Sequence, residues 1–319
     1  MMQSLLQIDA HFIEENTHFP SLIQALKSHF TQSGISIPKR HHHDFQNASS
    51  DKDTTLLLMP AWDPSGSAGV KVVTVNPDND KVGLPSVQGV YIHMEASTGV
   101  VKAIIDAKSL TAKRTAAASA LASTFLSNKN ADSLLMIGTG ALASNLIQAH
   151  ASVRNIKQVY LWGRNYKKAE ALSEKLKPLG IQAEPIQTIE EKISEVSIIS
   201  CATLSATPLV LGKYLRPGQH IDLVGAYKPN MREADDVTIE KASVHVDTYQ
   251  GLNESGDIVI PMQNGILKRE AIQSDLFELC SNAKEGRTHD DEITLFKSVG
   301  HAIEDLAAAN YYYKKMTHA

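Results

Sequence analysis

A glycine-rich turn between two apolar runs constrains this chain more than any other feature. The first run, Leu134 to Ile137, ends in Gly138-Thr-Gly140-Ala-Leu-Ala143, and a helical pattern then leads to the second run, Val159 to Trp162. A G-x-G-x-x-A pattern in this strand, turn, helix and strand context predicts a dinucleotide-binding βαβ unit. We expect Gly138 to allow the tight turn and Gly140 to let a pyrophosphate approach the backbone, at the helix N-terminus where N–H groups are available. The alternative is a βαβ unit that binds no dinucleotide.

The end of the second run bears on which dinucleotide is bound. A protein that binds NAD usually has Asp or Glu at this position, where the carboxylate accepts a hydrogen bond from the ribose 2′-hydroxyl. This chain has Gly163-Arg164-Asn165 instead, and no carboxylate before Glu170. An arginine can pair with a 2′-phosphate through charge-assisted hydrogen bonds. The pattern therefore favours NADPH, with NADH a weaker possibility, unless Arg164 is only a solvated surface residue.

Composition bounds the class of protein. The chain has 319 residues, 43% hydrophobic and 21% charged, with a net charge of −4, which is ordinary for a globular protein and gives no sign of a nucleic-acid surface. Cys201 and Cys280 do not make a disulfide framework. The first residues carry acids early and lack a basic region, so we expect no signal peptide, and no apolar run approaches membrane-spanning length. A cytoplasmic enzyme without membrane or nucleic-acid partners is the simplest interpretation.

The first fifty residues predict a helix and then an extended segment. Leu22, Ile23, Leu26 and Phe30 share one helical face. Three histidines, residues 41–43, follow Pro38, which favours extended chain. Adjacent side chains of a strand point to opposite faces, so the three cannot converge on one ion, and we expect no metal site.

Residues 54–110 are predicted to be rich in β-strands. Lys71 lies inside the β-branched run Gly69 to Val75, where a lysine either extends its head group to solvent or serves a site. An Ala-rich helix is expected over 109–126, with Ser109 as N-cap and Arg114 early in it. The polar segment 127–132 is the predicted domain boundary.

The remainder alternates strands and helices in the manner of an α/β domain. Further strands are expected at Val196–Cys201, His220–Val224 and Val244–Val246, and ligands of such sheets bind at the C-terminal strand ends. Thr294 to Tyr313 is expected to be helical and to pack on the first domain. The predicted fold class is α/β: a Rossmann-type dinucleotide-binding domain at 127–298, and an α+β domain formed by 1–126 with 299–319.

Ordered segments over nearly the whole chain resemble the ornithine cyclodeaminase/mu-crystallin family. The resembling segments are Met59-Pro-Ala-Trp62, Gly69-Val-Lys-Val-Val-Thr-Val75, Gly83-Leu-Pro-Ser-Val-Gln-Gly89, Leu110-Thr-Ala-Lys-Arg-Thr-Ala-Ala-Ala-Ser119, Arg216-Pro-Gly-Gln-His220, Val224-Gly-Ala-Tyr-Lys-Pro229, Glu254-Ser-Gly-Asp257 and Phe296-Lys-Ser-Val-Gly-His-Ala-Ile-Glu-Asp305.

The resemblance implies that the first domain binds substrate and forms a homodimer. It also implies that Arg40, Lys71 and Arg114 hold the α-carboxylate of a small substrate, with Lys71 and Arg114 as the catalytic pair. Whether Lys71 donates a proton or binds the carboxylate stays open, as does whether Asp305 orients a basic residue. The predicted cofactor-binding residues are Ser86, Gly138, Gly140, Ala141, Leu142, Arg164, Asn165, Thr203, Val224, Gly225, Ala226, Tyr227 and Ser298.

One departure from the family pattern indicates the branch. Cyclodeaminases of the family carry Asp in the loop where this chain has Tyr227. The loop resembles instead that of the family's ketimine-reductase branch. This resemblance implies an NAD(P)H-dependent imine reductase, an oxidoreductase acting on CH–NH bonds. The expected reactions are Δ1-pyrroline-2-carboxylate to L-proline and Δ1-piperideine-2-carboxylate to L-pipecolate. Three alternatives stay open: an alanine-type amino-acid dehydrogenase, an ornithine cyclodeaminase, and a non-catalytic mu-crystallin-like binder of NADPH or another ligand.

Overall fold

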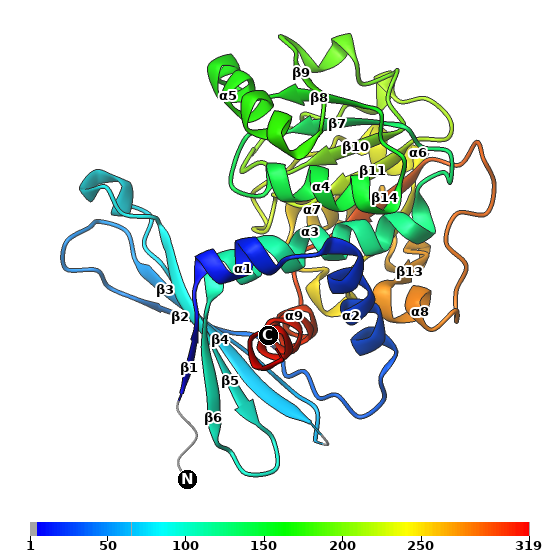
Figure 1. The fold of residues 1–319 in the computed structure, drawn as a ribbon. Helices are drawn as coiled ribbons and strands as arrows, with labels where there is room; N and C mark the ends of the chain where they lie inside the picture. The colour runs from blue at the N-terminus through cyan, green and yellow to red at the C-terminus, as the bar shows by residue number, and fades with distance from the viewer. Residues whose placement is uncertain (1–4, 65, 319) are drawn as a thin grey trace. The chain divides into compact units, whose positions relative to one another are not determined.

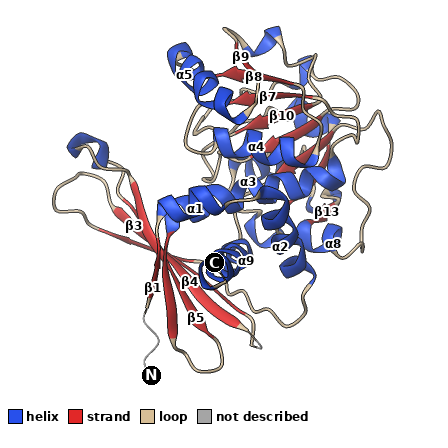
Figure 2. Cartoon of the chain, in the orientation of Figure 1, coloured by secondary structure: helices blue, strands red, loops and turns tan. Residues whose placement is uncertain are grey.

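The computed structural model describes residues 5–64 and 66–318, and the chain divides into two compact units. Unit 1 comprises the residues up to Arg114 and those from His301 onward, and unit 2 comprises Thr115–Gly300. The expected boundary at residue 127 follows the last residue of helix α3 (Ala107–Leu126), whereas the observed division falls inside that helix. Both units have the mixed α/β character that the sequence predicts, and their strands are red in Figure 2.

Unit 1 is built on a six-stranded sheet with the order β1-β6-β5-β4-β3-β2. β1 pairs with β6 in parallel, and all the other neighbours are antiparallel. The elements are β1 (Leu6–Ile8), α1 (Ala10–Asn16), α2 (Phe19–Thr31), β2 (His41–Phe45), β3 (Thr54–Trp62), β4 (Ser67–Val75), β5 (Val87–Glu95), β6 (Val101–Asp106) and α9 (Ala302–Thr317).

Helix α9 covers one face of this sheet, as Figure 1 shows. Side chains on β4 alternate, so Lys71 and Val73 are buried on the covered face. The predicted face of α2 is confirmed, because Leu22, Ile23 and Leu26 are all buried. The histidines of β2 are exposed and follow one another along a strand, as their sequence predicts.

The other face of the sheet is apolar and less covered. Val70 and Val72 of β4 and Ile92 of β5 are only partly buried there, and Val90 is exposed. The strand pairing places Val72 beside Val90, and Val70 beside Ile92. We call this surface the outer sheet face.

Unit 2 holds an eight-stranded, wholly parallel sheet with the order β13-β12-β14-β11-β10-β7-β8-β9. The run β9-β8-β7-β10-β11 follows the 3-2-1-4-5 part of the Rossmann order, and β14, the last strand in the chain, lies between β11 and β12. The elements are β7 (Ser133–Ile137), α4 (Ala143–Val153), β8 (Gln158–Trp162), α5 (Tyr166–Leu176), β9 (Ala183–Pro185), β10 (Ile198–Cys201), β11 (His220–Leu223), α6 (Asp236–Lys241), β12 (Ser243–Val246), α7 (Gly256–Gln263), β13 (Ser274–Asp275), α8 (Leu276–Cys280) and β14 (Thr294–Lys297). Its core includes Leu135, Ile199 and Ile221 from central strands.

The prediction of a helix from Thr294 is wrong. Thr294–Lys297 forms strand β14 between β11 and β12, and all four of its residues are buried. Leu295 therefore belongs to the core of unit 2. Gly300, with φ of +83°, separates this strand from α9, which begins at Ala302.

Helix α3 also begins earlier than expected. Ser109 is not the N-cap, because the helix starts at Ala107 and the Asp106 carboxylate accepts a hydrogen bond from the Ser109 N–H at 2.7 Å. At the other end, Arg154 donates to the carbonyls of Ser123 and Ser127, and the Arg287 Nε donates to that of Leu126. The Leu126 carbonyl is one that the helix itself leaves unpaired, and the Arg287 side chain satisfies it. In the part of the chain that the structure describes, no helix is both long and apolar enough to span a bilayer.

Candidate active site

Lys71 does not reach solvent; its side chain is only 4% exposed and meets a buried carboxylate of α9. The Lys71 Nζ lies 3.0 Å from Asp305 Oδ1 and 2.9 Å from Asp305 Oδ2. Lys71 is placed there by the alternation of β4, and Asp305 by the first turn of α9. Asp305 is thus a buried partner of Lys71 and not a surface carboxylate.

Arg114 joins the same cluster from α3. Its Nε lies 2.9 Å from Asp305 Oδ1, and its Nη1 donates to Glu304 Oε2 at 2.6 Å. Arg114, Glu304 and Asp305 are all buried. The structure therefore brings the two predicted catalytic residues together through Asp305, although they are far apart in the sequence.

The charges in this cluster shift the pKa values of its members. Burial, together with the positive charges of Arg114 and Arg40, lowers the pKa of Lys71 to about 8, against the attraction of Asp305. Burial raises the pKa of Asp305, but Arg114 and Lys71 outweigh burial and hold that pKa below its ordinary value. The cluster thus holds the cations Lys71 and Arg114 close together around one carboxylate. Such paired cations suit the carboxylate of a small ligand.

Tyr91 lies beside this cluster on the neighbouring strand. It pairs across the sheet with Lys71, and it is fully buried. Its ring occupies the space over Gly69, because a Cβ at Gly69 would lie 2.2 Å from the Tyr91 hydroxyl oxygen. Among the described residues that hydroxyl has no hydrogen-bond partner, and burial together with Asp305 raises its pKa well above the ordinary value. Tyr91 is a polar group at the site that the sequence did not single out.

In unit 2, the glycine turn after β7 has the shape that a pyrophosphate needs. Gly138 has φ of +116°, and a Cβ there would lie 2.6 Å from the carbonyl oxygen of Ala202, so only glycine fits. A Cβ at Gly140 would meet nothing within 4 Å, which leaves that side of the turn open. Helix α4 then begins without a side-chain cap or an acidic residue in its first turn. Its N-terminal N–H groups and dipole therefore suit an anion.

The loop after β8 carries Arg164 and Asn165, which are predicted to contact the adenosine ribose of the cofactor. Arg164 is exposed, and Asn165 caps α5 by accepting a hydrogen bond from the Lys167 N–H at 3.0 Å. Asn165 therefore serves as the N-cap of α5, whereas Arg164 is exposed at the surface beyond the end of β8.

The other predicted cofactor residues of unit 2 follow strands β10, β11 and β14 at the same edge of the sheet. Thr203 follows β10, Val224 to Tyr227 follow β11, and Ser298 follows β14. The Tyr227 side chain is 40% exposed, and the Ser298 hydroxyl donates to Asp247. Ser86 is the exception, since it belongs to unit 1, where its carbonyl accepts from the Asn76 N–H.

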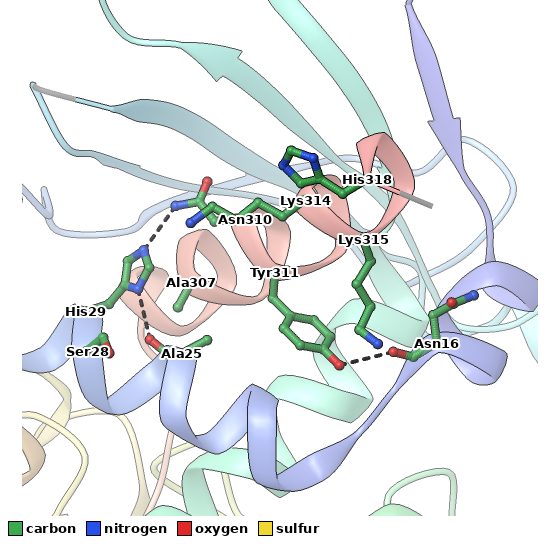
Figure 3. A pocket seen from close by; sticks show the side chains of 10 residues that line it. All are labelled: Asn16, Ala25, Ser28, His29, Ala307, Asn310, Tyr311, Lys314, Lys315 and His318. Carbon is green, nitrogen blue, oxygen red and sulfur yellow. Dashed lines mark hydrogen bonds between the residues drawn. The ribbon is translucent and has the colours of Figure 1, made fainter.

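A surface groove of about 600 Å³ in unit 1 is lined by α1, α2 and α9 (Figure 3). It contains none of the predicted site residues. Its polar walls are satisfied internally: His29 bonds the Ala25 carbonyl and the Asn310 amide, and the Tyr311 hydroxyl donates to the Asn16 carbonyl. The groove therefore offers little to a ligand beyond exposed lysines.

Sequence reasoning missed Glu304 and the buried groups Glu233, Asp257 and Lys297 of unit 2. Lys297 and Asp257 form an ion pair at 2.9 Å near the C-terminal strand ends. A signal was present, because Asp257, Lys297 and Glu304 all lie in the segments that carry the family resemblance. Nothing in those segments indicated that each of these groups would be buried.

The glycine turn, the open α4 N-terminus and the Rossmann strand order define a dinucleotide-binding protein with a separate cationic site. Comparison with known proteins agrees. The model of the ornithine cyclodeaminase/mu-crystallin family matches residues 4–319, and the chain belongs to this family, as its sequence predicts.

Named relatives share almost the full length. A Δ1-pyrroline-2-carboxylate reductase from Colwellia psychrerythraea is 38% identical over 313 residues, which covers 97% of this chain and 98% of the relative. The structure of the Thermococcus litoralis Δ1-pyrroline-2-carboxylate reductase, in complex with NADH and L-proline, has a TM-score of 0.91 and 33% identity, covering 98% of both chains. An archaeal alanine dehydrogenase dimer with bound NAD has a TM-score of 0.90 and 28% identity, covering 98% of this chain and 96% of that chain.

These relatives bear on the predictions. The expected fold class is confirmed by the structures, and the expected enzyme class, a nicotinamide-dependent oxidoreductase of C=N bonds, is that of the named reductases. The two structures hold NADH or NAD, so they support a nicotinamide dinucleotide without deciding in favour of NADPH.

Proposed function

We propose that this protein reduces cyclic ketimine acids, with Δ1-pyrroline-2-carboxylate and Δ1-piperideine-2-carboxylate as substrates and a nicotinamide dinucleotide as cofactor. The observation that carries the proposal is the buried cluster in which Asp305 contacts both Lys71 and Arg114. Two basic side chains held close together in this way suit the carboxylate of a small acid. The likeness to reductases named for such a substrate supports the same class of compound.

Arg114 is suited to bind the substrate carboxylate. A guanidinium presents planar, paired donors that match a carboxylate, and Glu304 and Asp305 fix its orientation from one side. Such a fixed fork orients the substrate ring before reaction. Arg40 adds positive charge to the same site.

Lys71 is suited to supply a proton. When bound, the dinucleotide supplies a hydride to the C2 carbon of the imine, and the ring nitrogen needs one proton for the product amine. The pKa of Lys71, about 8, is closer to neutrality than that of an ordinary lysine, which favours proton transfer near physiological pH. Asp305 would orient the Lys71 ammonium through their contact. It would also raise the pKa of Lys71, so that a larger fraction of Lys71 is protonated.

In unit 2, we assign the pyrophosphate to the Gly138–Leu142 turn and the α4 N-terminus. Gly140 gives the close approach, and Arg164 faces a 2′-phosphate if NADPH is the preferred cofactor. Thr203, Val224, Gly225, Ala226, Tyr227 and Ser298 are assigned to the remainder of the cofactor, on the side of β10, β11 and β14. Ser86 is also retained as a proposed cofactor contact.

The outer sheet face supports a homodimer as the working form. Its apolar side chains are partly exposed in the single chain, and closed two-fold dimers are the commonest oligomers. The domain that binds the substrate would thus also form the dimer.

One experiment tests the reaction. NADPH and NADH oxidation is followed with freshly prepared pyrroline-2-carboxylate, with piperideine-2-carboxylate, with pyruvate plus ammonia, and with ornithine in parallel assays. We expect turnover only with the two cyclic imines. Faster turnover with pyruvate plus ammonia would make it an alanine-type dehydrogenase. Ammonia release from ornithine without net cofactor oxidation would make it a cyclodeaminase, and cofactor binding with no turnover a binding protein.

A further inference from the structure

Glu233 is a buried carboxylate that ties together two of the loops assigned to the cofactor. It lies between β11 and α6 in unit 2 and is fully buried. Its Oε1 accepts hydrogen bonds from the Thr203 N–H at 2.7 Å and the Thr203 hydroxyl at 3.0 Å. Its Oε2 accepts from the N–H groups of Gly225 at 2.8 Å and Ala226 at 3.1 Å. One side chain therefore fixes the loop after β10 to the loop after β11.

The two loops are also in direct contact. A Cβ at Gly225 would lie 2.0 Å from the Thr203 carbonyl oxygen and 2.1 Å from the Thr203 nitrogen. Gly225 thus allows the loops to approach closely, and Glu233 satisfies the N–H groups that this approach buries. These N–H groups are used by the protein and are not offered to a ligand. The role of Glu233 is to set the position of the loops.

A second set of interactions holds Glu233 itself. Asp257 Oδ1 accepts from the backbone N–H groups of Glu233 at 2.7 Å and Ala234 at 3.1 Å. Lys297, at the end of β14, lies 2.9 Å from Asp257 Oδ2 and 3.6 Å from Glu233 Oε2. The loops after β10 and β11 are therefore anchored to α7 and β14 through charged, buried partners. Such networks rigidify the backbone they hold.

The strand order indicates which part of the cofactor these loops would meet. In a Rossmann sheet the dinucleotide crosses the C-terminal edge at the switch between β7 and β10, with its adenosine ribose at the end of β8. Its other half then lies beyond β10 and β11, where Thr203, Gly225 and Ala226 are found. The adenosine half and the nicotinamide half consequently depend on different loops.

We propose that Glu233 is a positioning residue that fixes the loops after β10 and β11, and that these loops bind the nicotinamide half of the cofactor. The inference rests on the proposed dinucleotide function. It assigns to Glu233 an effect on the nicotinamide half alone, separate from the pyrophosphate turn and from Arg164.

The test compares a whole cofactor with its fragment lacking nicotinamide. Dissociation constants are measured for NADH by fluorescence and for ADP-ribose by calorimetry, and for NADPH and 2′-phospho-ADP-ribose in the same way. Glu233→Gln places an amide NH₂ against N–H donors, so at least one loop loses its acceptor. We expect NADH or NADPH to bind about tenfold more weakly, equivalent to about 1.4 kcal/mol, while the fragment changes less than about twofold.

Asp222→Asn is the matched control, because Asp222 is a buried carboxylate of β11 that bonds Ser200 and His150 and not the two loops. Its ratio of cofactor to fragment affinity should equal that of the wild type. Glu233→Asp keeps the charge with a shorter reach and should give a smaller change in the same ratio, about threefold. If Glu233→Gln does not fold, the affinity ratio of Glu233→Asp tests the positioning role instead.

The outcomes separate this inference from the proposed function. An unchanged ratio in a folded Glu233 variant overturns the positioning role while the proposed function stands. A wild-type protein that binds neither cofactor nor fragment overturns the proposed function and this inference with it. Equal weakening of cofactor and fragment shows a general loss of structure and also overturns the specific role.

Discussion

At the scale of single residues, Asp305 is the connection on which the candidate site depends. It contacts Lys71 with both oxygens and Arg114 with one, and it is completely buried. Removing one partner from a buried ion pair is strongly destabilising, by about 3–5 kcal/mol, because a charge is left uncompensated. The Asp305 carboxylate also raises the pKa of Lys71, and this effect is measurable separately from the loss of stability.

Asp305→Asn should lower the pH at which activity is lost on the alkaline side. Burial lowers the pKa of Lys71 to about 8 and Asp305 opposes that effect, so removing the Asp305 carboxylate lowers the pKa of Lys71 further. If protonated Lys71 is required, the alkaline limb of kcat/KM moves to lower pH. The imine titrates equally in both assays, so a difference between proteins belongs to the enzyme. Glu304→Gln, which removes the carboxylate paired with Arg114, should move the limb less.

Arg114→Lys and Lys71→Ala should both impair reduction of the cyclic imine. Losing one partner of a buried charge pair costs about 2–5 kcal/mol, which is about thirtyfold to several thousandfold in kcat/KM. Lysine keeps the charge at 114 but lacks the planar fork. Steady-state kinetics beside a cofactor fluorescence titration gives the result, and cofactor affinity should be unchanged. Lys108→Ala, an exposed position of α3, is the control. Near wild-type kcat/KM in both variants would place the substrate elsewhere.

Arg164→Asp should change the cofactor preference. The exposed arginine beyond β8 can pair with a 2′-phosphate, whereas aspartate repels it and accepts from a ribose hydroxyl. We expect weaker NADPH binding with NADH binding kept or improved, measured as the ratio of the two dissociation constants. An unaltered ratio would remove Arg164 from the site.

At the scale of elements, the pairing of β4 with β5 depends on one missing side chain. A Cβ at Gly69 would lie 2.2–2.6 Å from three atoms of Tyr91, so Gly69→Ala forces the ring or the strand to move. Overpacking of this kind costs about 1–3 kcal/mol in the free energy of unfolding. Denaturant unfolding should show the loss, and the loss should shrink in a Tyr91→Leu background, where the ring is absent. Gly140→Ala, which meets no atom within 4 Å, should leave stability nearly unchanged or slightly higher.

The elements also show where sequence reasoning succeeds and fails. The glycine turn, the parallel strands and the apolar face of α2 were predictable, because each depends on local periodicity or on backbone conformations that favour glycine. Strand β14 was not, because four buried residues before a helical pattern carry no period of their own. The partnership of Lys71 with Asp305 joins residues 234 positions apart, and burial at that distance leaves no local signal. For Arg40, Lys71 and Arg114, the predicted role comes from the family resemblance and not from periodicity.

At the scale of the whole molecule, the outer sheet face of unit 1 predicts the oligomeric state. Val72→Asp places a charge at the centre of this apolar surface and should convert a homodimer into a monomer of 34.8 kDa, measured by light scattering at micromolar concentration. Val237→Asp, at an exposed apolar position of unit 2, should leave the mass unchanged. A wild-type protein that is monomeric under these conditions contradicts the prediction.

The return of the chain to unit 1 at His301 governs the order in which the molecule can fold during synthesis. Glu304 lies 190 positions after Arg114, so the ribosome adds residues for about 10–40 s, at ~5–20 residues per second, before both carboxylates of α9 exist. Throughout that time Lys71 and Arg114 lack the anions that later neutralise them. The nascent sheet therefore cannot bury these two cations, and unit 2 has all of its strands before unit 1 has its last helix. A chain interrupted after Gly300 would keep all the strands of unit 2 and would lack helix α9 of unit 1.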